Sequence, residues 1–201
     1  MGFKIRLFHV RKTLVLAALT TPLLTTLSPV HADQRVSGCF QLIAGMAVST
    51  VGIHEAGHTI GALALGYPMN DIHYKLSSVD VKGLAVGSHH DKIIKMSGFA
   101  AQALSSEIIF GVDRIPKDNW FVAGMLLGNI IHPIVYGARA EFGTNARDFE
   151  GFSRKERRIA EALIVADSLL TAYRAYKIKG FPIRIQSTGQ DIRLLWTKTF
   201  D

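Results

Sequence analysis

The chain has 201 residues, enough for one domain or for a small helical bundle with an appendage, and 48% of them are hydrophobic while 19% are charged. Its formal net charge of +7 comes from basic residues at the N-terminus, in the 139–158 segment and in the last third, without interleaved aromatic residues, which indicates a membrane surface and excludes a nucleic-acid platform. The single cysteine, Cys39, excludes an intrachain disulfide and a cysteine-based metal site.

The N-terminus has the three parts of a secretory signal peptide. Four basic residues precede an apolar run over about 13–27, and Val30 and Ala32 form a small-residue cleavage site. We therefore expect residues 1–32 to be a signal peptide that directs the chain to a bacterial cytoplasmic membrane. An uncleaved membrane anchor is the alternative, and in both cases Asp33 emerges on the outer side.

The first helix after the signal is predicted over about 41–66, and it contains the pattern His-Glu-x-x-His. Positions i and i+4 project from one face of a helix, so His54 and His58 can bind the same metal ion. Glu55 stands beside them, where it can take a proton from a water that the ion acidifies. The pattern predicts a zinc site with His54 and His58 as ligands and Glu55 as the general base.

The remaining elements follow in chain order. Segments 72–76 and 79–82 alternate apolar and polar residues with period two, which predicts a short β-hairpin. Helices are predicted over about 93–111 and 120–138, and the second of these contains no formal charge. A last helix, about 154–177, is amphipathic and is not predicted to span a membrane. Its apolar face consists of Ile159, Leu163, Ala166, Leu170 and Tyr173.

The predicted fold is mainly α: a membrane-embedded helical bundle with about three spans, a small β-hairpin between the first two helices and an amphipathic C-terminal helix. We divide the chain into a signal peptide (1–32), a membrane core that carries the metal motif (33–153), and a helix with a basic tail (154–201). With Asp33 outside, the three spans place the 139–158 segment on the cytoplasmic side. This segment contains six basic residues, in agreement with the positive-inside rule.

A catalytic zinc ion usually takes three protein ligands, so His54 and His58 need a partner. The downstream candidates are Glu107, His132, Glu141, Asp148 and Glu150. Depth in the membrane favours Asp148. His58 lies about 25 Å along its helix, near the inner face of a hydrocarbon core about 30 Å thick. Glu107 lies near the outer end of its segment, whereas Asp148 follows the inner end of the third span, in a loop with turn residues.

The motif resembles that of the site-2 protease family of membrane zinc metallopeptidases. The resemblance rests on His54-Glu55-Ala56-Gly57-His58 followed by Gly61-Ala62, and on Ser97-Gly98-Phe99-Ala100-Ala101-Gln102, which is similar to the small-residue start of the family's second helix. In that family a helix, a small sheet, a second helix and a later helix with an aspartate build the core, and the aspartate is the third zinc ligand. The resemblance covers roughly residues 41–150 and implies that Asp148 is this ligand. The family's Asn-Pro and Leu-Asp-Gly signatures are replaced here by Asn129-Ile130-Ile131-His132-Pro133 and Arg147-Asp148-Phe149.

The predicted function is that of a zinc-dependent membrane endopeptidase, which hydrolyses peptide bonds with a metal-activated water. Its expected partners are a membrane-associated protein or peptide substrate and membrane lipid, with no nucleic acid. One alternative is a non-catalytic membrane protein with a closed structural metal site, to which His132 would add a fourth ligand. A second alternative is a soluble extracytoplasmic zincin. A third, without a metal, is a polar cluster that packs a helix interface at the spacing Gly57-x-x-x-Gly61.

Overall fold

The computed structural model describes residues 32–75, 78–141, 147–187 and 192–196, so the predicted signal peptide, apart from Ala32, lies outside the described residues. By its contacts the chain divides into Met1–Ser37 with Phe200, and Gly38–Thr199 with Asp201. Only the first turns of one helix are described in the first unit. The packing described below is that of the second unit.

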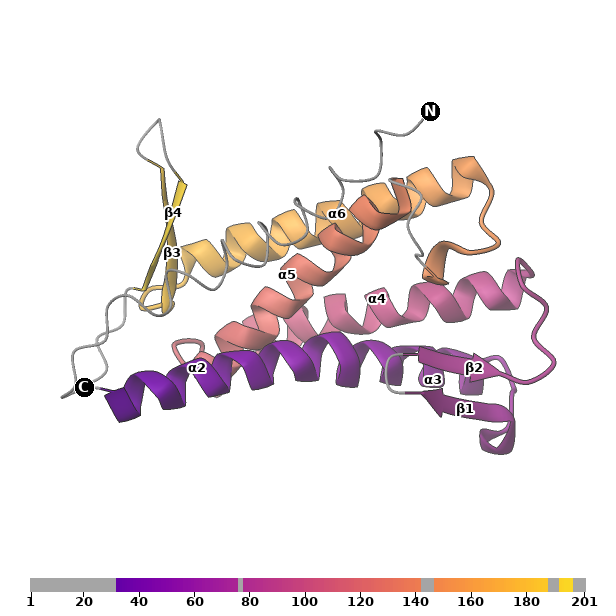
Figure 1. Ribbon diagram of the computed structural model, residues 1–201, viewed down its shortest axis with the longest axis horizontal. Coiled ribbons are helices and arrows are strands. Elements are labelled where there is room, and N and C mark those ends of the chain that lie inside the picture. Colours follow the sequence, from indigo (N-terminus) through magenta and orange to yellow (C-terminus); the bar gives the residue numbers. More distant parts are fainter. Residues whose placement is uncertain (1–31, 76–77, 142–146, 188–191, 197–201) are drawn as a thin grey trace, which may run out of the picture. The chain divides into compact units, whose positions relative to one another are not determined.

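The described part of the chain is mainly helical, as expected. One helical segment consists of α2 (Ala32–Ala47), the π-helical η2 (Val48–Ile53) and α3 (His54–Ala64). Three further helices follow: α4 (His89–Gly111), α5 (Trp120–Glu141) and α6 (Arg154–Lys177) (Figure 1). These four segments confirm the helices predicted over 41–66, 93–111, 120–138 and 154–177 and extend the first three of them.

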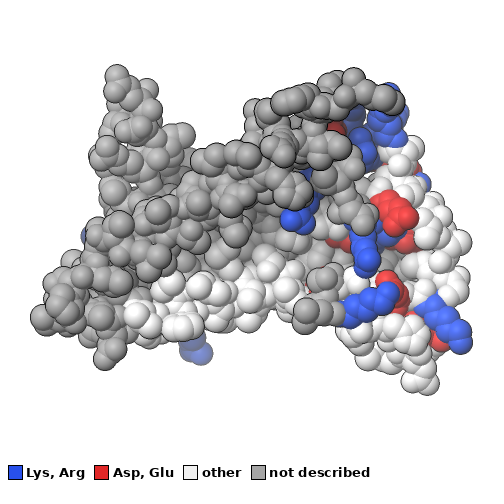
Figure 2. Space-filling model, in the orientation of Figure 1, with Lys and Arg blue, Asp and Glu red and all other residues white. Residues whose placement is uncertain are grey.

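The predicted β-hairpin is also confirmed. Strands β1 (Ile72–Lys75) and β2 (Ser78–Val81) are antiparallel, with Ile72 opposite Val81, while the turn at 76–77 lies outside the described residues. The apolar side of the hairpin packs on α3 and α4 through a cluster of the buried residues Ala62, Ile72 and Ile94. In Figure 2, lysine, arginine, aspartate and glutamate side chains gather on the right of the view, around this hairpin.

The C-terminal segment, which is predicted to be a basic tail, contains a second hairpin. Strands β3 (Ile183–Ser187) and β4 (Ile192–Trp196) are antiparallel, with Ile183 opposite Trp196. Both strands alternate apolar and polar residues at their start, which is the period-two pattern of a strand.

Helix α6 is amphipathic as predicted, and its apolar side is turned outward. The expected apolar face is exposed: Leu163 is 63% and Tyr173 59% accessible to solvent. The residues that face the other helices are small or polar, with one isoleucine, and they are Ala160, Ile164, Ser168, Thr171 and Ala175. In a protein surrounded by water, an amphipathic helix normally turns its apolar side inward, so α6 departs from this general rule.

Two helical segments among the described residues are long and apolar enough to cross a membrane. They are Val36–Ala64 and Trp120–Glu141. Helix α4, expected as a further span, does not meet the same criterion. It carries Asp91, Lys92 and Lys95 in its first two turns and a glutamate near its end, and these charges reduce its apolar character.

Candidate metal centre

The two motif histidines lie at the junction between η2 and α3. His54 is the first residue of α3, and the backbone on both sides of the junction is right-handed helical, so the π segment runs into α3 without a break. A π turn holds more residues than an α turn and therefore shifts the face that the following residues present. Both histidines are buried, with exposed fractions of 2% and 5%.

Hydrogen bonds fix which ring nitrogen of each histidine carries the proton. The Nδ1 atom of His58 lies 2.6 Å from the backbone carbonyl of Ile94, which can only accept, so Nδ1–H is the donor. The Nδ1 atom of His54 lies 3.1 Å from Oε1 of Gln102. The amide of Gln102 is oriented by its own Nε2, which donates to the Ser49 carbonyl at 3.3 Å. In the neutral rings both Nε2 atoms therefore keep a free lone pair.

Asp148 reaches these nitrogens because the next residue anchors its loop. Phe149, in the short helix η4 (Arg147–Phe149), is 5% exposed and stacks on Phe99 of α4 with 6.0 Å between ring centres. The backbone N–H of Asp148 donates to the hydroxyl of Tyr136 at 3.2 Å. The apolar cluster of Phe99, Phe149 and Ile164 thus holds the aspartate over α3 and α4.

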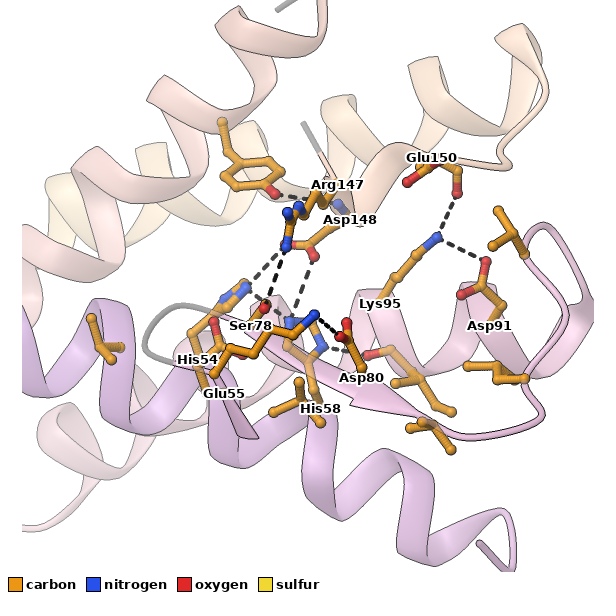
Figure 3. Close-up of a pocket in the computed structure, with 18 of the residues that line it drawn as sticks. His54, Glu55, His58, Ser78, Asp80, Asp91, Lys95, Arg147, Asp148 and Glu150 are labelled. Carbon is orange, nitrogen blue, oxygen red and sulfur yellow. Dashed lines mark hydrogen bonds and ion pairs between the residues drawn. The ribbon is translucent and has the colours of Figure 1, made fainter. Parts of the chain in front are cut away.

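The three side chains bring their acceptor atoms together (Figure 3). Nε2 of His54 lies 3.1 Å from Nε2 of His58 and 3.1 Å from a carboxylate oxygen of Asp148, and Nε2 of His58 lies 3.7 Å from the other oxygen. The three possible ligand atoms all lie within 4.8 Å of one another. Lone pairs this close repel unless a cation lies between them, either a metal ion or an additional proton on one imidazole. The cluster can therefore hold a metal ion.

The electrostatics of Asp148 agree with this description. Burial raises the pKa of the Asp148 carboxyl, but its hydrogen bond with His54 and the nearby imidazole of His58 outweigh this effect, so the pKa lies below its ordinary value. The carboxylate is ionised at neutral pH, as a metal ligand must be.

Glu55 lies beside the cluster with an unused acceptor. It lines the same cleft as the three candidate ligands, and its Oε2 atom is buried without a hydrogen-bond partner among the described residues. A buried carboxylate oxygen without a partner is costly, so such an atom indicates that a donor outside the chain's own atoms approaches it. A water molecule next to a metal ion is such a donor.

The cleft has a volume of 820 Å³ and is lined by η2, α3, the first hairpin, α4, α5 and the loop after α5. Next to the two histidines, α4 can approach closely only because residue 98 is a glycine. A Cβ atom at this position would lie 2.7 Å from Cε1 of His58 and 2.8 Å from Cε1 of His54. Gly57 lets α3 approach Ser97 and Ala101 of α4 in the same way. The small-residue spacing therefore has a packing role alongside the metal motif, and the two interpretations are compatible.

The other candidate ligands do not belong to this three-residue group. Glu107 is ion-paired with Arg174, and Glu141 lies 4.0 Å from Arg157. The Glu150 carbonyl accepts a hydrogen bond from Lys95 at the rim of the cleft. The ring of His132 packs against that of His54 with 4.7 Å between centres, and its Nδ1 lies 3.2 Å from Oε1 of Gln102. Among the described residues, the group that can hold a metal contains His54, His58 and Asp148.

Sequence reasoning missed Gln102, which is 1% exposed. It continues into a buried polar network: Ser49 donates to Asn129 at 2.5 Å, and the Asn129 amide donates to Ser105 and Ser106 at 2.8 Å. The sequence did contain a signal, because the polar residues Gln102, Ser105 and Ser106 interrupt the apolar run of α4. We define Ser49, Gln102, Ser105, Ser106 and Asn129 as the polar network.

Comparisons of the chain with models of protein families, with curated proteins and with solved structures found no match.

Proposed function

We propose that the protein is a zinc-dependent membrane endopeptidase of the kind its motif resembles. The observation that carries the proposal is the convergence of three lone-pair donors, from His54, His58 and Asp148, next to the unpaired carboxylate oxygen of Glu55. Two imidazoles and one carboxylate form a donor set typical of catalytic zinc, which keeps a further position open.

In this mechanism His54, His58 and Asp148 hold the ion. When bound, zinc supplies Lewis acidity, which polarises the scissile carbonyl and makes a neighbouring water acidic. Glu55 accepts the proton of that water at Oε2 and then donates it to the leaving amine. Gln102 and the Ile94 carbonyl keep the two imidazoles in the tautomer that leaves Nε2 free.

The first hairpin offers a way to bind the substrate. Ser78, Val79, Asp80 and Val81 of β2 line the cleft, and among the described residues β2 pairs only with β1. An extended peptide can add to a free strand edge through main-chain hydrogen bonds, which do not depend on its side chains. This placement would bring a peptide bond alongside Glu55.

The burial of the apolar helices supports a membrane setting. Only 22% of the most apolar stretch of Val36–Ala64 is buried, whereas the core helix of a soluble domain is mostly buried. This disfavours the soluble zincin. We propose that α4 crosses the membrane as a third span, because its charges lie near its two ends and 96–106 contain none. The metal centre would then lie toward the cytoplasmic face.

The closed structural site is a weaker alternative. It would need a fourth ligand, and His132 is the nearest candidate, but its Nδ1 is directed to Gln102 and its ring packs against His54. Three ligands beside an unpaired carboxylate fit a catalytic site better than a closed one.

The test compares the parent with Glu55→Gln in membranes of an expressing host, with new protein N-termini measured by mass spectrometry. We expect cleavages that depend on the parent and disappear with Glu55→Gln, while the purified variant keeps its metal. Equal cleavage by both proteins would refute the role of Glu55. Metal in both proteins without any cleavage would favour the structural site.

A further inference from the structure

Helix α6 has an outer surface that is unusual for a protein surrounded by water. From Ile159 to Tyr173 every exposed residue is apolar, and these residues are Ile159, Ala162, Leu163, Ala166, Leu169, Leu170 and Tyr173. Five of them are between 51% and 63% accessible. The buried face contains Ser168 and Thr171. The hydroxyl of Ser168 donates a hydrogen bond to the backbone carbonyl of Ile164 at 2.8 Å. The helix therefore presents its apolar side outward and its polar side to its neighbours.

The charges within α6 are turned toward other helices. The side chain of Glu161 is 12% exposed and lies 3.5 Å from Arg157. Arg174 pairs with Glu107 of α4, and its guanidinium lies 4.3 Å from the ring centre of Phe110. Such residues lower the mean hydropathy of the helix without lying on its outer face. A hydropathy average thus underestimates how apolar the exposed side of α6 is.

Helix α6 also runs antiparallel to α5 along its whole length, and the two pack side by side (Figure 1). At one end, Arg157 lies next to Glu141, the last residue of α5. At the other end, a Cβ atom on Gly180 would lie 3.9 Å from that of Asp118, two residues before α5 begins. Helix α6 has 24 residues and is about 36 Å long, and its apolar outer face over 159–173 covers about 22 Å of this length. Long basic side chains at both ends can extend to the headgroups, which allows the helix to cross a hydrocarbon core of about 30 Å.

Basic residues lie at both ends of this apolar surface. They are Arg154, Lys155, Arg157 and Arg158 at the start, and Arg174, Lys177 and Lys179 at the end. Long basic side chains extend to the headgroups from the ends of a span, and tyrosines such as Tyr173 and Tyr176 are enriched at that level.

We propose that α6 is itself a membrane span, with its outer face against lipid acyl chains. The inference rests on the proposed membrane setting: if α5 crosses the bilayer, a helix aligned with it from end to end crosses it too. Exposed apolar residues also lie on α5 and α3, namely Ile131, Ile134 and Val135 on α5 and Ile60 and Leu63 on α3. The second hairpin, β3–β4, then lies on the opposite side of the membrane from the metal centre.

Single cysteines in the full chain, on a Cys39→Ser background, test this topology. The exposed positions are Asp113→Cys before α5, Lys155→Cys at the start of α6 and Lys179→Cys after α6. With a membrane-impermeant maleimide on intact spheroplasts, we expect Asp113→Cys and Lys179→Cys to be labelled equally and Lys155→Cys to stay at background. On inside-out vesicles the pattern reverses.

Two other results overturn the inference in distinguishable ways. If Lys179→Cys behaves like Lys155→Cys while Asp113→Cys differs, α5 spans but α6 does not, and only this inference fails. If all three behave alike, α5 does not span, and the membrane setting of the proposed function fails with it.

A spin label identifies what covers the outer face. We place it at Leu163→Cys or Leu170→Cys in liposomes, with Lys155→Cys as the water-exposed control. Lipid contact predicts high collision rates with oxygen and low rates with a water-soluble nickel chelate. High nickel accessibility would indicate water, and low accessibility to both would indicate a protein partner, either another segment or a second copy. Each of these results would contradict the lipid contact.

Discussion

The metal centre and the polar network are two buried polar clusters held by the same helices, and they differ in one respect. In the polar network each donor finds an acceptor: Gln102 donates to Ser49, Ser49 to Asn129, and Asn129 to two serines. In the metal centre, by contrast, the Nε2 atoms of two neutral histidines and the carboxylate of Asp148 can all act as acceptors, and they lie next to one another. Buried polar groups are normally satisfied, so a cluster that its own residues leave unsatisfied indicates a ligand. The polar network stabilises the bundle, whereas the metal centre is arranged to bind.

The largest expected effect comes from removing the anchor of the aspartate. Phe149→Ala deletes a buried aromatic ring, which costs about 3–5 kcal/mol of unfolding free energy. It also frees the loop that holds Asp148, so bound metal should be lost. Thermal unfolding and metal content in detergent measure both effects. Phe40→Ala, at a position that is 68% exposed, is the control and should change neither. Full metal retention in Phe149→Ala would show that the loop is held in another way.

A second substitution acts on the histidines without removing any group. Gly98→Ala places a methyl group against both imidazole rings, and overpacking of this kind costs about 1–3 kcal/mol. Because the rings must move, we expect metal affinity to fall by about 10- to 100-fold. Gly52→Ala is the matched control, since its Cβ would meet nothing closer than 3.9 Å. Equal metal affinity in the two variants would contradict the role of Gly98 in making room for the two imidazole rings.

Gln102 connects the two clusters, so a substitution there can be compared with one that affects the polar network alone. Gln102→Leu removes the acceptor that orients His54, so it should lower metal affinity by about 10-fold and stability by about 1–3 kcal/mol. Ser106→Ala, within the polar network only, should lower stability by about 1 kcal/mol and leave metal affinity unchanged. Zinc titration with a competing chelator separates the two. A comparable loss of affinity in Ser106→Ala would mean that the clusters are not distinct.

Several parts of this architecture were predictable because their signals are local. The His-Glu-x-x-His spacing on an apolar helix predicts two ligands and a base, and the helix and hairpin boundaries follow from periodicity and glycine stops. The prediction of Asp148 depends on depth along the spans, across 90 residues, and on the resemblance of the histidine motif to that of the site-2 proteases. The structure brings it to the histidines, although nothing in its local sequence resembles the family signature.

The features that escaped prediction depend on tertiary surroundings. Which side of α6 faces inward is decided by the medium outside the protein, and periodicity cannot report that medium. Gln102 is an ordinary polar residue until the fold brings its Oε1 to two histidines. The β3–β4 hairpin has a period-two pattern at the start of each strand, but the segment was predicted only as a basic tail.

The most direct test of the metal centre is the metal content of three purified full-length proteins: the parent, His58→Ala and Asp148→Ala, each dialysed against trace zinc. We expect about one zinc per chain in the parent and loss of the metal in both variants, while circular dichroism shows the helices retained. Zinc retained at parental stoichiometry and affinity in Asp148→Ala, or no zinc in the parent, would contradict the assignment of these residues as ligands.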